Sequence, residues 1–109
     1  MNEEDLRRLE ALGSKVEFAA GKVLIERSQP GTGLFVVVDG ELVVEAPEGT
    51  RELGPGAVFG ERALLSADGL RTGRVRALTD GAVIAVDRPE VDRLCAEDPG
   101  LAERLAELY

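Results

Sequence analysis

Apolar residues recur with two different periods along this chain, and the change of period divides it into three parts. Between residues 15 and 86, short segments rich in Val, Leu, Ile and Phe are separated by turns that contain glycine or proline. Segments of this kind are typical of β-strands. We predict eight strands: Lys15–Ala19, Lys22–Glu26, Leu34–Asp39, Glu41–Ala46, Arg51–Leu53, Ala57–Phe59, Arg74–Leu78 and Ala82–Val86.

The two ends of the chain show the helical period instead. Residues 3–12 read as a helix with Asn2 as candidate N-cap. A second helix is predicted over Pro89–Ala96, and a third after Asp98, which precedes Pro99 in the first turn, where proline is tolerated. The apolar stripes that carry these predictions are Leu6, Leu9 and Leu12 in the first helix and Leu101, Leu105 and Leu108 in the last.

Eight short strands with turn signals at this spacing predict an all-β fold in which closure or double sheets protect the edges. Asp39-Gly40, between two apolar runs, is a tight-hairpin signal. We therefore expect a mainly β domain with flanking helices: an eight-stranded antiparallel jelly-roll β-barrel with N-terminal and C-terminal helices. No linker or repeat interrupts the sequence, so residues 1–109 are expected to form a single domain.

Charge and hydropathy exclude several classes of partner. The formal net charge is −8, which disfavours nucleic acid because a phosphate backbone requires a basic face. No apolar run approaches the roughly 20 residues that a membrane span requires. The N-terminal residues are acidic and show no signal peptide, so we expect a cytoplasmic protein without membrane contact.

Two residue types bear on catalysis. The chain has no histidine, so the commonest general base and the commonest metal ligand are both missing. This makes a metal-dependent enzyme on a jelly-roll barrel an unfavoured alternative, and we expect no metal site and no enzymatic activity. The single cysteine, Cys95, lies on the apolar face of a predicted helix and is interpreted as a core residue.

The most informative stretch is residues 57–77. Phe59 can end a strand, Gly60 lets the backbone turn, and Glu61–Leu65 reads as a helical turn whose first amides suit an anion. Arg71 could bind the same anion with its forked guanidinium. Glu61 is an unusual companion for a phosphate unless the ligand also carries hydroxyl donors, so a phosphate beside a ribose fits best.

Simpler interpretations of these residues stay open at this point. Glu61 could merely interact with the helix dipole, a contribution of about 0.3–1 kcal/mol. Arg71 could form an exposed ion pair with Asp68, worth roughly 0–1 kcal/mol. Three further arginines could attract an anion, although solvated strand and helix faces are the favoured explanation for them: Arg62, Arg74 and Arg76.

The pattern as a whole resembles the cyclic nucleotide-binding domain, the module shared by the bacterial catabolite activator protein and the regulatory subunits of protein kinase A. Phe59–Leu65 (FGERALL) is similar to the start of the phosphate-binding cassette of that family, and Arg71–Ala77 (RTGRVRA) to its end. Gly21, Gly40 and Gly60 fall where the family has turn glycines. The resemblance covers nearly the whole chain.

The resemblance implies a ligand site and no other cofactor. Glu61 would accept a hydrogen bond from the ribose 2′-hydroxyl, and Arg71 would pair with the cyclic phosphate. A threonine at position 72 resembles the cGMP-binding kind in eukaryotic members and commonly serves cAMP in bacterial ones, so cAMP is the expected ligand and cGMP the second choice. The predicted ligand-binding residues are Phe59, Gly60, Glu61, Arg62, Ala63, Arg71, Thr72 and Gly73.

Departures from the family pattern define the alternative function. Leu70 replaces a frequent proline, and Gly73 replaces the usual alanine, so both could weaken affinity. The C-terminal helix that closes the base side of the pocket in family members is expected to be truncated or absent. A degenerate fold that serves as a protein–protein interaction scaffold is therefore the alternative to a regulatory sensor. Dimerisation and the effector are left open.

Overall fold

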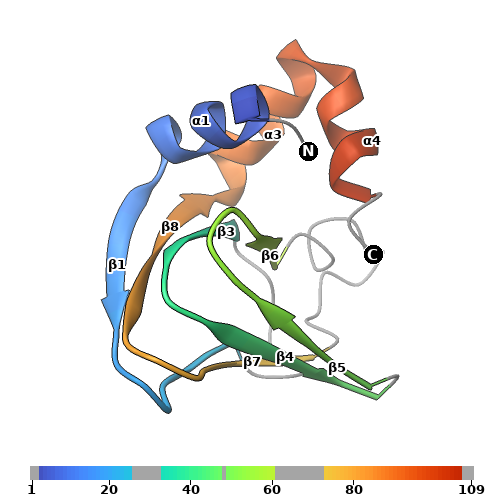
Figure 1. The fold of residues 1–109 in the computed structure, drawn as a ribbon. Helices are drawn as coiled ribbons and strands as arrows, with labels where there is room; N and C mark the ends of the chain where they lie inside the picture. Colours follow the sequence, from blue (N-terminus) through green and yellow to red (C-terminus); the bar gives the residue numbers. More distant parts are fainter. Residues whose placement is uncertain (1–2, 26–32, 48, 61–72, 107–109) are drawn as a thin grey trace.

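The computed structural model describes residues 3–25, 33–47, 49–60 and 73–106. Strands and helices follow one another in the predicted order (Figure 1). The strands are β1 (Ser14–Phe18), β2 (Val23–Ile25), β3 (Gly33–Asp39), β4 (Leu42–Ala46), β5 (Gly49–Leu53), β6 (Val58–Phe59), β7 (Arg74–Ala77) and β8 (Gly81–Asp87). The helices are α1 (Glu3–Leu12), α3 (Arg88–Glu97) and α4 (Pro99–Ala106).

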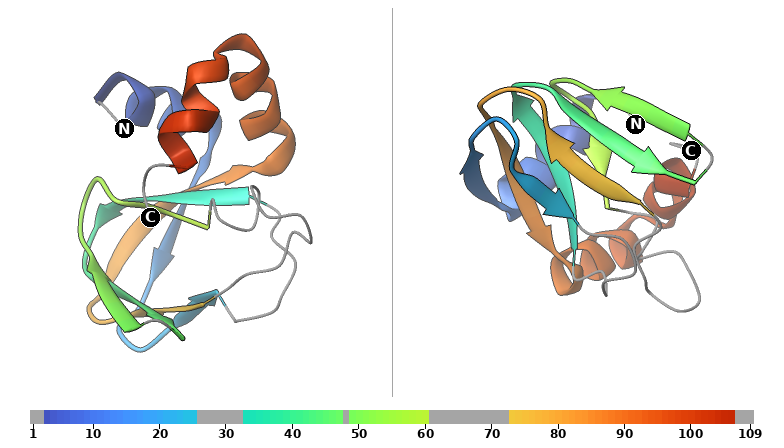
Figure 2. Two further views of the ribbon diagram at one scale, coloured as in Figure 1. Left: turned by 90° about the vertical axis from the view of Figure 1, so that its right-hand side faces the viewer. Right: turned by 90° about the horizontal axis from the view of Figure 1, so that it is seen from below.

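The strands form two four-stranded antiparallel sheets. The first has the order β1-β8-β3-β6 and the second the order β2-β7-β4-β5. Helices α1, α3 and α4 lie at the same end of the first sheet, and the second sheet lies away from them (Figure 2). This arrangement confirms the predicted jelly roll of antiparallel strands with flanking helices.

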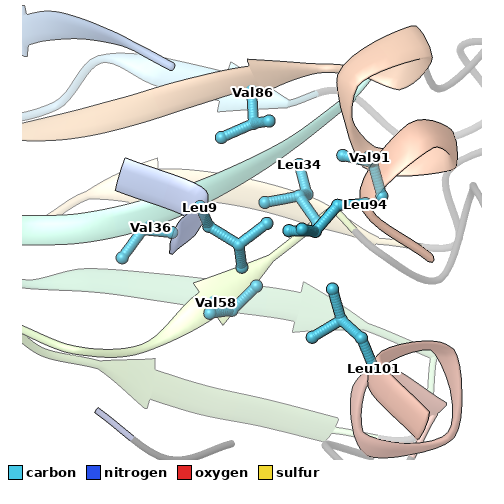
Figure 3. Close-up of a cluster of buried hydrophobic side chains, with 8 residues drawn as sticks. All are labelled: Leu9, Leu34, Val36, Val58, Val86, Val91, Leu94 and Leu101. Atoms are coloured by element: carbon cyan, nitrogen blue, oxygen red, sulfur yellow. The ribbon is translucent and has the colours of Figure 1, made fainter. Parts of the chain in front are cut away.

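Side chains of the first sheet alternate between two cores, because successive residues of a strand face opposite sides. In β3, Leu34 and Val36 belong to a cluster shared with the helices, and Val37 belongs to a second cluster. The helix-side cluster brings together residues of α1, β3, β6, β8, α3 and α4 (Figure 3). Its members are Leu9, Leu34, Val36, Val58, Val86, Val91, Leu94 and Leu101.

The second cluster lies between the two sheets. Its buried members come from seven strands of the two sheets, and β7 contributes two of them, Val75 and Ala77. Phe59 is its largest fully buried side chain. The remaining buried members are Phe18, Val37, Leu42, Leu53 and Val83. The continuous apolar run in β3 is thus explained by burial on both faces.

Four charged side chains connect α1 to the last two helices. Asp5 is 2% exposed, and its two oxygens accept hydrogen bonds from Arg104 Nε at 2.6 Å and Nη2 at 2.9 Å. Asp98 Oδ2 accepts from Arg104 Nη2 at 2.9 Å and from Arg8 Nη1 at 3.0 Å. These bonds from Arg8 and Arg104 lower the pKa of Asp98. The ends of the described chain are therefore joined through one hydrogen-bonded network.

Predicted boundaries differ from the observed ones by a few residues. The segment predicted as Arg51–Leu53 begins earlier, at Gly49, because Gly49 pairs with Ala46 at the end of a hairpin. The prediction of a tight hairpin at Asp39-Gly40 is wrong, because β3 and β4 do not pair and belong to different sheets. The chain does turn there: Gly40 has φ +87°, and a Cβ at this position would lie 2.6 Å from the Asp80 carbonyl oxygen. Only glycine satisfies both conditions at this turn. Asn2 and Leu108 lie outside the described residues, as does the side chain of Leu105.

Candidate functional site

The predicted cassette begins at the end of β6. Phe59 is fully buried and pairs in register with Phe35 of β3, and the two rings stack with centroids 5.0 Å apart at 15°. The next residue, Gly60, has φ +91°, a conformation that favours glycine. The prediction that Phe59 ends a strand and Gly60 turns the backbone is confirmed.

The described part of the cassette's end begins at Gly73, directly before β7. A Cβ built on Gly73 would lie 3.0 Å from the Glu45 carbonyl oxygen, 3.2 Å from Ala46 Cβ and 3.5 Å from Val44 Cγ1. The backbone at position 73 therefore runs close against β4. The absence of a side chain at this position permits that approach without displacement of β4.

The two ends of the cassette belong to different sheets. β6 is the edge strand of the first sheet, whereas β7 lies inside the second. Residues 61–72 therefore connect one sheet to the other. Five of the predicted ligand-binding residues fall within this connection and lie outside the described residues: Glu61, Arg62, Ala63, Arg71 and Thr72. The same applies to Asp68, the alternative partner of Arg71.

The core between the sheets is open to solvent at several positions. Four apolar side chains pack against this core and keep partial exposure: Leu24, Phe35, Val44 and Ala57. Arg51 of β5 is exposed and pairs in register with Val44, which places it on the same face of the second sheet. The sequence pattern alone did not place Phe35 or Arg51 at this core. The sequence did contain a signal for the position of Arg51. Arg51 lies two residues before the apolar Leu53 in a strand, so the two side chains face the same side of the sheet.

The outer face of the second sheet carries other arginines. Arg76 Nε donates to Glu45 Oε1 at 3.2 Å, and both side chains are over one third exposed. Such a pair contributes little to stability. Arg74 is also exposed and pairs in register with Glu45. For Arg76, the interpretation as part of a solvated strand face is confirmed.

A shallow hollow of about 540 Å³ lies elsewhere on the first sheet. Its lining includes Asp39 and Gly81. These residues lie at one end of the β3–β8 pair, and Gly33 and Asp87 lie at the other end. It carries one lysine and three carboxylates, and its full lining is Lys15, Glu17, Phe18, Ala19, Asp39, Asp80, Gly81 and Ala82. Asp80 Oδ1 accepts a hydrogen bond from the Ala20 amide at 2.8 Å, which assigns this carboxylate a role in the turn.

Cys95 and the helices of the described residues have roles in packing. Cys95 is partly buried against the helix-side cluster, as predicted, and burial raises the pKa of its thiol. Among the described residues, no group of three or more His, Cys, Asp or Glu side chains is arranged to hold a metal ion. None of the helices in the described ranges has the length and apolar character needed to cross a membrane.

Comparison with known proteins identifies the family. Residues 15–98 match the family model described as cyclic nucleotide-binding domain. Over 84 residues the chain is 38% identical to a cyclic nucleotide-gated potassium channel of Mesorhizobium japonicum, covering 77% of this chain and 23% of the channel. It is 31% identical over 103 residues to the cAMP-dependent protein kinase regulatory subunit of Dictyostelium discoideum, covering 86% of this chain and 31% of that protein. The chain thus spans under a third of these two relatives.

Solved structures agree with this assignment. One, from work on a cyclic-GMP-dependent signalling pathway that regulates bacterial phytopathogenesis, has a TM-score of 0.84 at 33% identity and covers 98% of this chain and 89% of its own. The catabolite activator protein of Thermus thermophilus has a TM-score of 0.80 at 26% identity, over 99% of this chain and 53% of its own. The chain belongs to the cyclic nucleotide-binding domain family.

Proposed function

We propose that this chain is a regulatory module that binds a purine cyclic nucleotide through residues 59–73. One observation carries the proposal. The cassette motif occupies the connection between the two sheets, and both of its described ends are fixed by the fold, Gly60 by its turn and Gly73 by its contact with β4. A segment whose two ends are positioned by the fold is suited to holding a small ligand between the sheets.

The roles of the individual residues follow from their chemistry. An ionised glutamate only accepts hydrogen bonds, so Glu61 suits a ribose 2′-hydroxyl. The planar fork of Arg71 suits the cyclic phosphate, and the first amides of the turn after Gly60 supply further donors. Amides near Arg62, Ala63 and Thr72 complete the phosphate site in this proposal.

The identity of the base is a separate question. Relatives of this chain include proteins named for each nucleotide: the cAMP-dependent kinase subunit of Dictyostelium discoideum and the cGMP-dependent protein kinase egl-4 of Caenorhabditis elegans, which is 42% identical over 71 residues. The sequence motif by itself favoured cAMP through Thr72. Titration with both nucleotides decides between them.

The proposed mechanism is a population shift. Binding of the phosphate orders residues 60–74, and the C-terminal helices repack in response. The free energy that reaches an effector cannot exceed the difference between the ligand affinities of the two conformations. Cytoplasmic regulation of an attached or separate effector is the biological setting that we propose for this module.

Calorimetric titration of the chain with cAMP and cGMP tests the proposal. We expect binding to the wild type and a loss of roughly 1.5–3 kcal/mol in Arg71→Ala, the scale of a charge-assisted hydrogen bond. Arg88→Ala is the matched control, because it removes the same charge from an arginine outside the cassette. The Arg88 side chain in α3 is 46% exposed, and its Nε lies 3.7 Å from Asp92 Oδ2. Equal affinity in Arg71→Ala and wild type would reject the role of Arg71.

A second titration tests the ribose contact. Glu61→Ala should weaken binding of the natural nucleotide and have a smaller effect on a 2′-deoxy analogue, because the hydroxyl partner is then already absent. The same loss with both ligands would reject this role. Absence of heat with either nucleotide at high concentration would favour the scaffold alternative, in which the fold has lost its ligand.

A further inference from the structure

Strand β1 is an edge strand whose outer side is open. In the order β1-β8-β3-β6 it comes first, and in the described part of the chain it pairs with β8 alone. It lies at the margin of the molecule in Figure 1. Every residue of β1 except Phe18 is exposed. The outer side of this strand can therefore accept a further strand.

The central residue of β1 is apolar and faces inward. Val16 is in register with Val83, which is fully buried in the core between the sheets. Directly opposed residues of an antiparallel pair share one face, so Val16 faces the side of this core. Val16 is nevertheless 46% exposed, more than any other large apolar side chain in the described ranges. The apolar face of the first sheet thus continues to its edge without cover.

The two neighbours of Val16 carry opposite charges on the other face. Because successive residues of a strand alternate, Lys15 and Glu17 share the face opposite to Val16. Both line the shallow hollow on the first sheet. Within the described ranges, neither side chain forms an ion pair. An open edge therefore carries a positive, an apolar and a negative side chain in succession.

We propose that β1 is a self-association surface, at which two copies of this chain pair edge to edge in antiparallel orientation. The first sheets of the two copies then form one continuous sheet. A two-fold axis at Val16 sets the register: Val16 faces Val16 of the second copy, and Lys15 faces Glu17 on both sides of the axis. The inference is independent of the proposed function, because none of these residues belongs to the cassette.

The charge pattern favours this register over its neighbours. An axis moved by one residue places Lys15 opposite Lys15 or Glu17 opposite Glu17, and like charges directly opposed destabilise a strand pair. Strand β5, at the edge of the second sheet, has no complementary register of this kind. An axis at Arg51 or at Glu52 opposes like charges, and an axis at Thr50 gives Arg51 no charged partner. Self-complementarity of β1 points to a second copy as the partner.

A protective role for Lys15 makes a different prediction. Lysine on an edge strand is one way in which proteins prevent pairing with other chains. If Lys15 serves only this purpose, the chain stays monomeric. In the proposed pairing, reversal of the Lys15 charge weakens association instead. The contact involves one short strand from each copy, so we expect a weak dimer with an interface smaller than that of stable complexes.

Sedimentation equilibrium of the chain without nucleotide, from about 10 μM to about 1 mM, measures this association. Salt at about 0.15 M screens the repulsion between the two net charges of −8 beyond ~8 Å. The variants are Lys15→Glu, Glu17→Lys and the double reversal. Arg88→Glu and Glu52→Lys are matched controls, because they make the same charge changes at exposed positions outside β1. Circular dichroism reports the folding of each variant.

We expect wild type to dimerise within this range, and amide hydrogen exchange in β1 to slow as the concentration rises. Each single reversal converts two attractive pairs into two repulsive ones and should weaken dimerisation about 10-fold. The double reversal restores opposite charges across the axis, so its dissociation constant should lie within about threefold of the wild-type value. The two control variants should behave as wild type.

Three results would overturn the inference. They are a wild-type chain that stays monomeric throughout the range, dimerisation that the double reversal fails to restore, and slowed exchange that lies outside β1. If a reversal variant fails to fold, the sedimentation and exchange of wild type decide. Each of these outcomes leaves the proposed function untouched, because the residues of the cassette are unchanged in every variant.

Discussion

Replacement of Leu101 by alanine tests how firmly the last helix is held against the sheet. Leu101 of α4 is fully buried and belongs to the helix-side cluster. In Figure 3 its side chain extends from α4 toward Val58 and Leu94. Removal of this side chain should therefore destabilise the whole domain, because the contact joins α4 to strands β3 and β6 and to α3.

The magnitude can be worked from burial. Leu→Ala removes roughly three methylene equivalents at ~0.8 kcal/mol each, or about 2.4 kcal/mol. A cavity left between Leu101 and its neighbours raises the expected loss to about 3–4 kcal/mol, within the range for fully buried leucines. Domains of this size have unfolding free energies of roughly 5–15 kcal/mol, so the loss is a large fraction of the total.

Urea unfolding followed by circular dichroism is the suitable assay, because the chain has no tryptophan and a single tyrosine. Leu78→Ala is the matched control: the same substitution at a side chain that is 40% exposed should cost less than about 1 kcal/mol. If Leu101→Ala costs no more than Leu78→Ala, α4 is not packed on the sheet in solution and the reasoning is wrong.

Three further predictions concern single residues. The pKa of Asp98 is lowered in the folded state, so its contribution to stability is present above its ordinary pKa and is lost as pH falls through the folded value; Asp98→Asn should flatten acid unfolding curves in that range. Cys95 has a raised pKa and is partly buried, so iodoacetamide at about pH 8 should modify it slowly in the folded protein and rapidly in urea, and equal rates would contradict this. Gly81→Ala should lower the thermal midpoint, because its Cβ would lie 2.7 Å from Phe18 Cζ and closer still to the Asp39 carbonyl oxygen, whereas Gly54→Ala meets only the flexible Glu41 side chain and should have little effect.

Much of the fold could be predicted from local signals, because most helices and strands are bounded by residues that favour turns or helix ends. Glycine turns delimit the strands, and the change to a helical period marks α3 and α4. The sequence also predicted that Phe59 ends a strand and that Gly60 turns, since both follow from local backbone preferences. Boundaries were less predictable. Gly49 belongs to β5 only because Ala46 is its partner across the hairpin, and pairing of this kind is not visible in one segment alone.

Features that depend on contacts between residues far apart in the sequence could not be predicted from the local pattern. Asp5 lies in the first turn of α1, where acidic residues are usually solvated, yet it is buried by its bonds to Arg104, which is 99 positions away. Similarly, the inward position of Arg51 depends on its register with Val44. A short strand of mixed residues does not reveal its inner face until its partner is known.

The two residues of β6 explain how a ligand at the cassette can act on the helices. Val58 belongs to the helix-side cluster with Leu101, whereas Phe59 lies in the core between the sheets and stacks on Phe35. Because neighbouring residues of a strand face opposite sides, a displacement of β6 changes the packing of both cores together. Gly60 follows directly, so we expect reorganisation of the cassette to reach α4 through Val58 and Leu101. In the proposed mechanism, the nucleotide can shift α4 only by as much free energy as its difference in affinity for the two packings of this contact supplies.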